Sequence, residues 1–402
     1  MPRSARAALS VLLLLASLGL VVAVFEVGLR LTGHQAIYEM YSKPSLFWRY
    51  DELLGWSHEP GAHGEFVGPR PWPIEFHANV AINSLGLRGP EIPSRDPTEL
   101  RVLFAGDSII AGFEVENDLT FVSRVGPLLR DRLGVAVRTF NAGVRGYGTD
   151  QSYLYFRERG SRLEPDLVVF FHTSNDPSDN TTLHEMRRPF GKPAFSLTPT
   201  GDLALVGAPV PHYPSCSEVL LSPEYEARRV DQPLGRLLCD AQMVLFDHSA
   251  LFSYLTLAVP WDYSFLKRLF YVGNPHAEHL KVNPVDGFEG RLTTAIVLAF
   301  AREVQRRGAT FMLTGYPSHL AQLDRSAIAE AGIPVIDFTE IEVHLGELSW
   351  HHDGHFNPEG HRVAARVLVD ALEPRLRARA AAIAPSGAKP DYGTGEMLPS
   401  SR

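Results

Sequence analysis

The stretch RVLFAGDS, residues 101–108, is the part of the sequence that decides the fold. Its first five residues form a short and mostly apolar run, which is typical of a buried strand in a parallel sheet. The glycine, aspartate and serine that follow predict a tight turn at the end of that strand. A strand that ends in this way is the beginning of an α/β unit, so further units are expected downstream.

Alternating strand and helix patterns continue towards the C-terminus. Strands are predicted at residues 101–105, 135–140, 166–171, 309–314 and 334–338, and helices at residues 117–133, 150–159, 288–307, 320–331 and 358–376. Five strands separated by helices predict one five-stranded parallel sheet with helices on both faces, a flavodoxin-like three-layer sandwich. The core domain is therefore expected to span residues 101–376.

Other segments lack this alternation. Residues 34–100 are rich in Pro, Gly and aromatics, and predict an irregular extension of short strands and turns packed on the core. Residues 177–285 predict a large insertion, partly helical near residues 224–247. This insertion holds Cys216 and Cys239, which either pair or remain separate thiols. Residues 377–402 are rich in Ala, Pro, Gly and Ser and predict a disordered tail.

The N-terminal segment, residues 1–33, predicts a membrane anchor. Two arginines precede residues 7–25, a run without charge that is just long enough to span a bilayer core. Arginines before the run and Glu26 after it orient the remainder of a single-pass protein to the extracytoplasmic side. The alternative is a cleaved signal peptide, with a secreted or periplasmic chain that begins at Val24.

The overall charge argues against one class of partner. The formal net charge is −8 and the pI is about 6.1, so no broad basic face is expected. Nucleic acid is therefore not an expected partner.

Polar groups follow the predicted strands at residues 106–108, 141–148 and 172–176, and a fourth group lies at residues 351–358. Because the carboxyl ends of parallel strands share one edge, these segments are expected to converge. They supply the hydroxyl of Ser108, glycine backbone at Gly146, the amide of Asn175, and the carboxylate of Asp353 beside the imidazole of His355. A hydroxyl, a base, an orienting acid and oxyanion donors are what acyl transfer requires.

At these segments the chain resembles the SGNH (GDSL-type) hydrolases, over residues 101–176 and 288–376. The resemblance implies that Ser108 is the nucleophile and His355 the general base, with Ser108, Gly146 and Asn175 forming the oxyanion hole. It also implies hydrolysis of an O-acyl ester through an acyl-enzyme. Residues 82–88 look like a membrane-anchored branch of the family.

Two departures from the family pattern bear on the site. Thr173 stands where the third block usually has glycine two residues before its asparagine, so a shift of that strand end is expected. His352 occupies the usual position of the acid, three residues before the base. Asp353, two residues before His355, is therefore assigned as the orienting acid.

No cofactor and no metal are expected. The histidines around Asp353 are of a type that binds zinc, but no second ligand cluster accompanies them in the sequence. The expected substrate is an acylated small molecule, glycan or lipid. Two alternatives remain: an O-acyltransferase acting on cell-envelope polysaccharide with the same serine, and a non-catalytic envelope protein that binds a partner.

Overall fold

The fold is seen in a computed structural model, which describes residues 3–34, 47–68, 74–183, 191–210, 241, 244–245, 248–257, 285 and 287–384. Its centre is a parallel five-stranded sheet in the order β11-β10-β7-β5-β6. The strands are β5 (Glu99–Gly106), β6 (Ala136–Gly143), β7 (Leu167–Phe171), β10 (Thr310–Gly315) and β11 (Val335–Asp337). The predicted fold class is confirmed.

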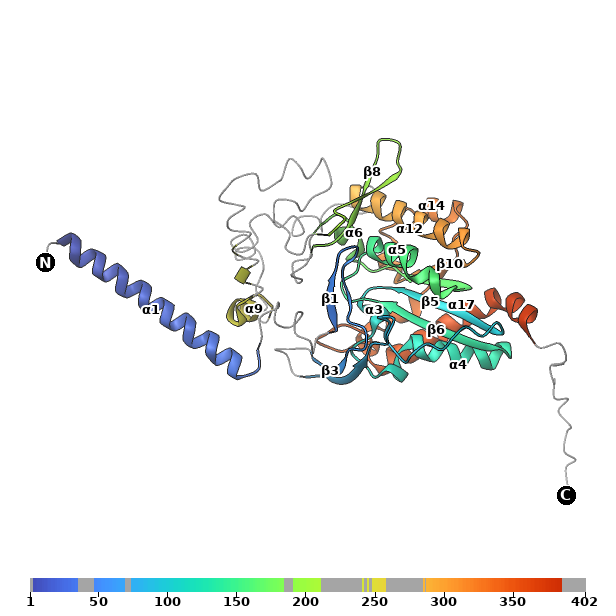
Figure 1. The fold of residues 1–402 in the computed structure, drawn as a ribbon, viewed down its shortest axis with the longest axis horizontal. Coiled ribbons are helices and arrows are strands. Elements are labelled where there is room, and N and C mark those ends of the chain that lie inside the picture. Colours follow the sequence, from blue (N-terminus) through green and yellow to red (C-terminus); the bar gives the residue numbers. More distant parts are fainter. Residues whose placement is uncertain are drawn as a thin grey trace, which may run out of the picture.

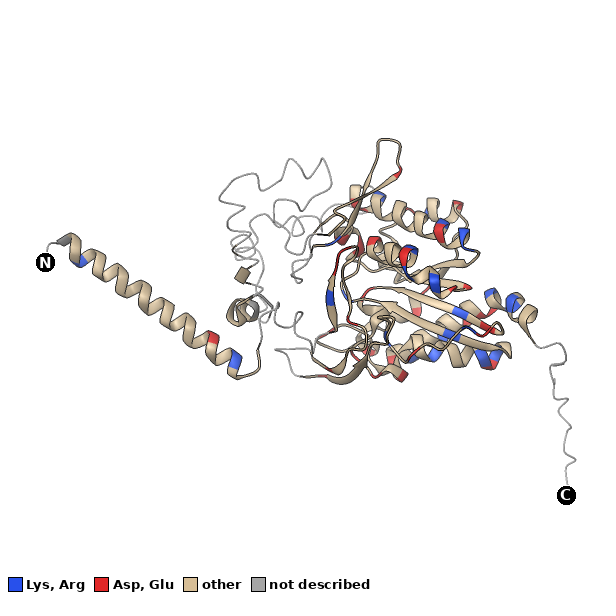
Figure 2. Ribbon diagram, in the orientation of Figure 1, with Lys and Arg blue, Asp and Glu red and all other residues tan. Residues whose placement is uncertain are grey.

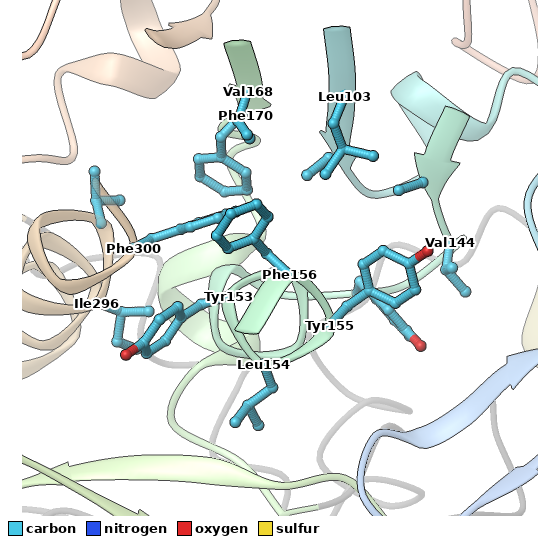
Figure 3. Packing of buried hydrophobic residues seen from close by; sticks show 14 of the residues in the cluster. Leu103, Val144, Tyr153, Leu154, Tyr155, Phe156, Val168, Phe170, Ile296 and Phe300 are labelled. Carbon is cyan, nitrogen blue, oxygen red and sulfur yellow. The ribbon is translucent and has the colours of Figure 1, made fainter. Parts of the chain in front are cut away.

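Helices cover both faces of the sheet (Figure 1). On one face, α5 (Thr149–Glu158) and α12 (Phe288–Arg306) pack against alternate residues of the strands. Figure 3 shows this packing, in which the ring centroid of Phe300 lies 5.5 Å from that of Phe156 and 5.6 Å from that of Phe170. On the other face, α4 (Phe121–Leu133) and α17 (Pro358–Ile383) cover the remaining strand residues.

Three helix predictions differ from the structure in detail. The helix expected from residue 117 is divided into η1 (Asn117–Leu119) and α4, because the Thr120 side chain caps α4 by accepting from the Ser123 N–H at 3.2 Å. The helix expected at residues 320–331 is α13 (Pro317–Leu320) followed by α14 (Arg325–Glu330), with Asp324 as the cap between them. The last helix, α17, continues to Ile383, beyond the expected core boundary at residue 376, because Leu376 and Ala380 keep its apolar side buried.

Short helices that were not predicted lie at turns between these elements. They are α3 (Ser108–Ala111), η2 (Gly160–Leu163), α6 (Asp176–Asp179), α15 (Thr339–Val343) and α16 (Leu345–Leu348). The first and third matter for function, because α3 begins just after β5 and α6 follows β7 within five residues.

The N-terminal extension forms two antiparallel hairpins. Strands β1 (Trp48–Asp51) and β2 (Gly55–His58) form one, and β3 (His63–Gly68) and β4 (Phe76–Ala81) form the other. The extension is joined to the core at Arg88, whose backbone bridges to Asn141 of β6 and whose buried guanidinium donates to three carbonyls of residues 111–115. The extension is thus part of the wall around the edge where β5 and β6 end.

The described part of the insertion contains a hairpin of β8 (Ala194–Leu197) and β9 (Leu203–Val206), and a helix, α9 (Ala250–Leu257). The hairpin was not predicted. Most of residues 224–247, together with Cys216 and Cys239, lie outside the described residues, so the helix expected there and the alternatives for the cysteines remain predictions.

The N-terminal helix α1 (Arg3–Leu31) contains a segment, Ser4–Leu31, that is long and apolar enough to cross a membrane. It projects away from the core in Figure 1, and its charged residues lie only near its two ends in Figure 2. The Glu26 carboxylate accepts from the backbone N–H groups of Ala250 and Leu251, each at 2.9 Å, so α1 contacts the start of α9.

A buried ion pair fixes the start of the insertion to the core. The Lys192 ammonium bonds the carboxylate of Asp150, at the start of α5, and donates to the Asp179 carbonyl at 2.7 Å. Both side chains are fully buried, at 1% and 0% exposure. Because Asp179 ends α6, the ammonium holds that helix against the core.

Replacing Lys192 with methionine is therefore expected to lower the free energy of unfolding by about 3–5 kcal/mol, because the Asp150 charge would stay buried without its partner. Denaturant unfolding of the purified protein measures the effect. The double variant Lys192→Met/Asp150→Asn carries no buried charge at this place and should recover much of the loss. Equal stability of the single variant and the natural protein would contradict the assigned role.

Candidate active site

Ser108 is the first residue of α3, directly beyond the carboxyl end of β5. The Asp107 side chain caps the helix by accepting from the Ile109 N–H at 3.0 Å. The turn requires glycine at position 106, where φ is +150° and an added Cβ would lie 2.9 Å from the Ile110 side chain and 3.1 Å from the Phe171 carbonyl oxygen. The strand end and the cap together hold the Ser108 side chain at the sheet edge.

Asp353 and His355 lie on a tight loop between α16 and α17. The loop is closed by backbone bonds from Trp350 N–H to the His355 carbonyl at 2.8 Å and from Gly354 N–H to the Trp350 carbonyl at 2.9 Å. Glu75, from the N-terminal extension, accepts from the N–H groups of residues 351–353 at 2.9–3.3 Å. A carboxylate from a distant segment therefore fixes the loop that carries the imidazole.

These elements bring Ser108, His355 and Asp353 into one hydrogen-bonded series. His355 Nε2 lies 2.8 Å from Ser108 Oγ, and His355 Nδ1 lies 2.5 Å from Asp353 Oδ1. The spacing of two residues between acid and base is therefore compatible with direct contact. The order of groups allows the imidazole to take the serine proton while the carboxylate stabilises the resulting cation.

The surroundings shift the pKa values of these groups. Burial alone would lower the pKa of His355, but the negative charges of Glu114 and Asp353 outweigh it and raise this pKa above its ordinary value. Burial opposes ionisation of Asp353, yet the hydrogen bond and positive charge of His355 lower its pKa. Burial, together with the charge of Asp176, raises the pKa of Asp107 to about 6.

Thr173 connects the first and third polar segments. Its hydroxyl donates to Asp107 Oδ2 at 3.1 Å, and its backbone N–H donates to Asp176 Oδ2 at 3.0 Å. Asp176 also bonds His172 Nδ1 at 2.8 Å. The threonine that departs from the family pattern thus ties the end of β7 to the cap of α3.

The two other predicted oxyanion donors lie on either side of β5. Asn175 immediately precedes α6, beyond β7, is exposed, and donates from Nδ2 to Asp179 Oδ2 at 2.7 Å. That bond uses one of the two hydrogens on Nδ2 and leaves the other for a ligand. Gly146 lies in the turn after β6 with φ of +79°, a conformation that favours glycine.

An open cleft of about 660 Å³ lies over Ser108 and His355. Asn175 lines it, whereas Gly146 and Asp353 are not among the described residues that do. Tyr316, His319 and other side chains beyond β10, which the sequence did not suggest, form the opposite wall together with Trp350. The cleft is lined by both polar and apolar groups, as a site for an acylated substrate requires.

Two residues near the base were not predicted from the sequence. The carboxylate of Glu114 lies 3.6 Å from His355 Nδ1 and is ion-paired with Arg145. Glu114, Asp353 and His355 place their donor atoms within 4.8 Å of one another, the grouping in the described part of the chain that could hold a metal ion. Both ring nitrogens of His355 are already engaged by Ser108 and Asp353, which fits proton transfer better than metal binding.

The comparisons with solved structures found several similar chains. A lipase/acylhydrolase from Enterococcus faecalis is 12% identical, with 69% of this chain and 96% of that chain covered and a TM-score of 0.33. An acetylxylan esterase from Geobacillus stearothermophilus is 13% identical, with 67% and 93% covered and a TM-score of 0.34. The esterase EstA from Pseudoalteromonas sp. is 9% identical, with 69% and 98% covered and a TM-score of 0.34. No curated protein matches the chain.

A family comparison matches residues 104–205 to the GDSL-like lipase/acylhydrolase family. The matched segment includes Ser108, Gly146 and Asn175, and ends before Asp353 and His355. It begins within β5 and contains the first three of the four polar segments at the sheet edge. Residues 104–205 are therefore similar to the GDSL-like lipase/acylhydrolase family, and this match indicates a hydrolase that acts on ester bonds.

Proposed function

We propose that the protein is a serine esterase that hydrolyses an O-acyl ester with Ser108, His355 and Asp353 as its catalytic residues. The observation that carries the proposal is the series of hydrogen bonds from Ser108 Oγ to His355 Nε2 and from His355 Nδ1 to Asp353. Its position in an open cleft at the carboxyl edge of the sheet supports the same role.

The reaction proceeds in two acyl-transfer steps. As Ser108 Oγ attacks the ester carbonyl carbon, its proton passes to His355 Nε2. The oxyanion receives hydrogen bonds from the backbone N–H groups of Ser108 and Gly146 and from the Asn175 amide. The tetrahedral intermediate then expels the alkoxide, which takes the proton from His355 and leaves an acyl-enzyme. Water then attacks the acyl-enzyme carbonyl as its proton passes to His355, and collapse of this second intermediate expels Ser108 Oγ, which takes the proton back from His355 and frees the acid.

Labelling with a fluorophosphonate probe tests the nucleophile without knowledge of the natural substrate. The probe should modify Ser108, as mass spectrometry of the corresponding peptide would detect. Folded protein that remains unlabelled would instead favour the non-catalytic binding protein. A panel of acylated sugars and lipid esters then identifies the donor, and an alcohol-dependent transfer product that outcompetes hydrolysis would favour the O-acyltransferase.

The expected contribution of Asn175 can be measured by removing its amide. Asn175→Ala should reduce kcat by about 100- to 1,000-fold, because one donor to the oxyanion is lost. Steady-state hydrolysis of p-nitrophenyl acetate gives the value. Ser178→Ala, which removes a half-buried hydroxyl of α6 that donates to the Asn175 carbonyl but leaves the Asn175 amide in place, serves as the control and should retain most of the activity. A variant without Asn175 that turns over normally would remove this residue from the oxyanion hole.

We further propose that α1 anchors the protein in a membrane with the catalytic domain on the extracytoplasmic side. The length and apolar character of Ser4–Leu31 support the anchor, and the arginines at its start support the orientation. Mass spectrometry of the mature N-terminus tests it: a chain that retains α1 is expected, whereas a chain beginning at Val24 would indicate a cleaved signal peptide and a secreted or periplasmic protein.

A further inference from the structure

An ion pair between the fully buried Glu114 and the partly buried Arg145 lies beside the candidate base and has no part in the reaction as described above. The Glu114 side chain is 0% exposed, and its Oε1 both pairs with the Arg145 guanidinium and lies 3.6 Å from His355 Nδ1. Within the described part of the chain, Glu114 Oε2 is also buried and has no hydrogen-bond partner. Removing a carboxylate from water without satisfying both oxygens is unfavourable, so its position needs an explanation.

Arg145 is held in place by the N-terminal extension. Its guanidinium lies 5.1 Å from the centre of the Phe66 ring, and its carbonyl accepts from Trp56 Nε1 at 3.1 Å. Arg145 also directly precedes Gly146, a candidate oxyanion donor. The ion pair therefore joins the loop after α3 to the turn after β6, beside the imidazole.

We propose that Glu114 and Arg145 are positioning residues that set the charge balance at His355. Glu114 is a second carboxylate near Nδ1, beside Asp353, and its charge stabilises the imidazolium that forms when Ser108 is deprotonated. Arg145 partly neutralises Glu114, so that His355 still gives up its proton to the leaving group. The inference rests on the proposed roles of Ser108 and His355.

The charged and titratable groups around His355 support these opposing roles of Glu114 and Arg145. Asp353 acts on His355 from its own loop, and Glu114 and Arg145 act on it from the loops after α3 and β6. Two further titratable groups interact with it: Asp107 at the end of β5 and His361 on α17. Burial lowers the pKa of His355; of the charges that act on it, Glu114 raises this pKa the most, and Arg145 opposes it. Glu114 and Arg145 thus act on His355 in opposite directions.

Because Glu114 and Arg145 shift the pKa of His355 in opposite directions, their substitutions give a test that distinguishes positioning residues from merely structural ones. Glu114→Gln keeps the shape of the side chain but removes its charge, so His355 should become protonated only at lower pH. Arg145→Gln removes the opposing charge, so His355 should become protonated at higher pH. The Glu114 carboxylate lies 3.6 Å from His355 Nδ1, and a charge this close shifts a pKa by about one unit or more, which sets the displacement expected for Glu114→Gln.

Two measurements on the full-length protein in detergent follow these displacements. The pH dependence of His355 modification by diethyl pyrocarbonate, read by mass spectrometry, reports its protonation without requiring catalysis. The pH dependence of Ser108 labelling by a fluorophosphonate reports the same group through the nucleophile. The acid limbs of both profiles should move to lower pH in Glu114→Gln and to higher pH in Arg145→Gln, and Arg145→Lys should restore the natural profile.

The outcomes separate this inference from the proposed function. If His355 modification keeps its natural midpoint in both folded Gln variants, the inference is overturned, even if their thermal stability falls. If one Gln variant does not fold, an unchanged midpoint in the other, or a failure of Arg145→Lys to restore the profile, overturns it equally. If the midpoints move in opposite directions but Ser108 is not labelled, the charge balance stands and the esterase proposal fails.

Discussion

Replacing Ser108 with alanine is expected to reduce ester hydrolysis by about 10⁴- to 10⁶-fold, which is the scale on which loss of a serine nucleophile acts in other hydrolases. The physical reason is that Ser108 Oγ lies 2.8 Å from His355 Nε2, the distance at which its proton can be removed as it attacks. Initial rates with p-nitrophenyl acetate, measured on purified protein, give the size of the effect.

The matched control is Ser174→Ala, which removes a hydroxyl from the same cleft without touching the Ser108–His355 hydrogen bond. It should keep most of the activity, and both variants should unfold at the temperature of the natural protein. Undiminished hydrolysis by Ser108→Ala would end the serine-esterase proposal.

The loss of His355 should be about as severe. His355→Ala leaves Ser108 without a base, so turnover should again fall by roughly 10⁴-fold or more. Because the serine and the histidine act in the same step, the double variant Ser108→Ala/His355→Ala should be no slower than either single variant. The measurement is the same ester assay, extended to long incubation times.

His352→Ala is the control for this prediction, since His352 is an exposed residue of the same loop. It should leave turnover largely intact. Additive losses in the double variant, with each residue contributing independently, would show that Ser108 and His355 do not work as a unit.

Much of the fold was predictable because its signals are local. Residues 102–105 are continuous and apolar since β5 is buried on both faces, and a glycine follows because the turn at Gly106 admits no side chain. The errors also have local causes. Thr120 ends η1 and caps α4, and Asp324 caps the start of α14.

The candidate site likewise contains residues that could be predicted from the sequence and residues that could not. Ser108, Asn175 and His355 could be singled out because each belongs to a short segment beside a strand or helix end, and the parallel sheet brings such ends together. Glu75, Glu114 and Arg145 could not, because an isolated Glu or Arg in a loop is ordinary in any sequence. Their significance depends on contacts with residues far away in the chain, such as Glu75 with the loop at residues 351–353.

The amino-acid sequence by itself determined the parallel sheet, the order of its strands along the chain and the chemical groups at its edge, because apolar periodicity and turn residues act over a few positions. Only the tertiary structure decided that Glu114 lies near His355 in addition to Asp353, and that Lys192 neutralises the buried Asp150. The physical reason is that charge pairing depends on distance and burial, and both are set by the packing of segments that are remote in sequence.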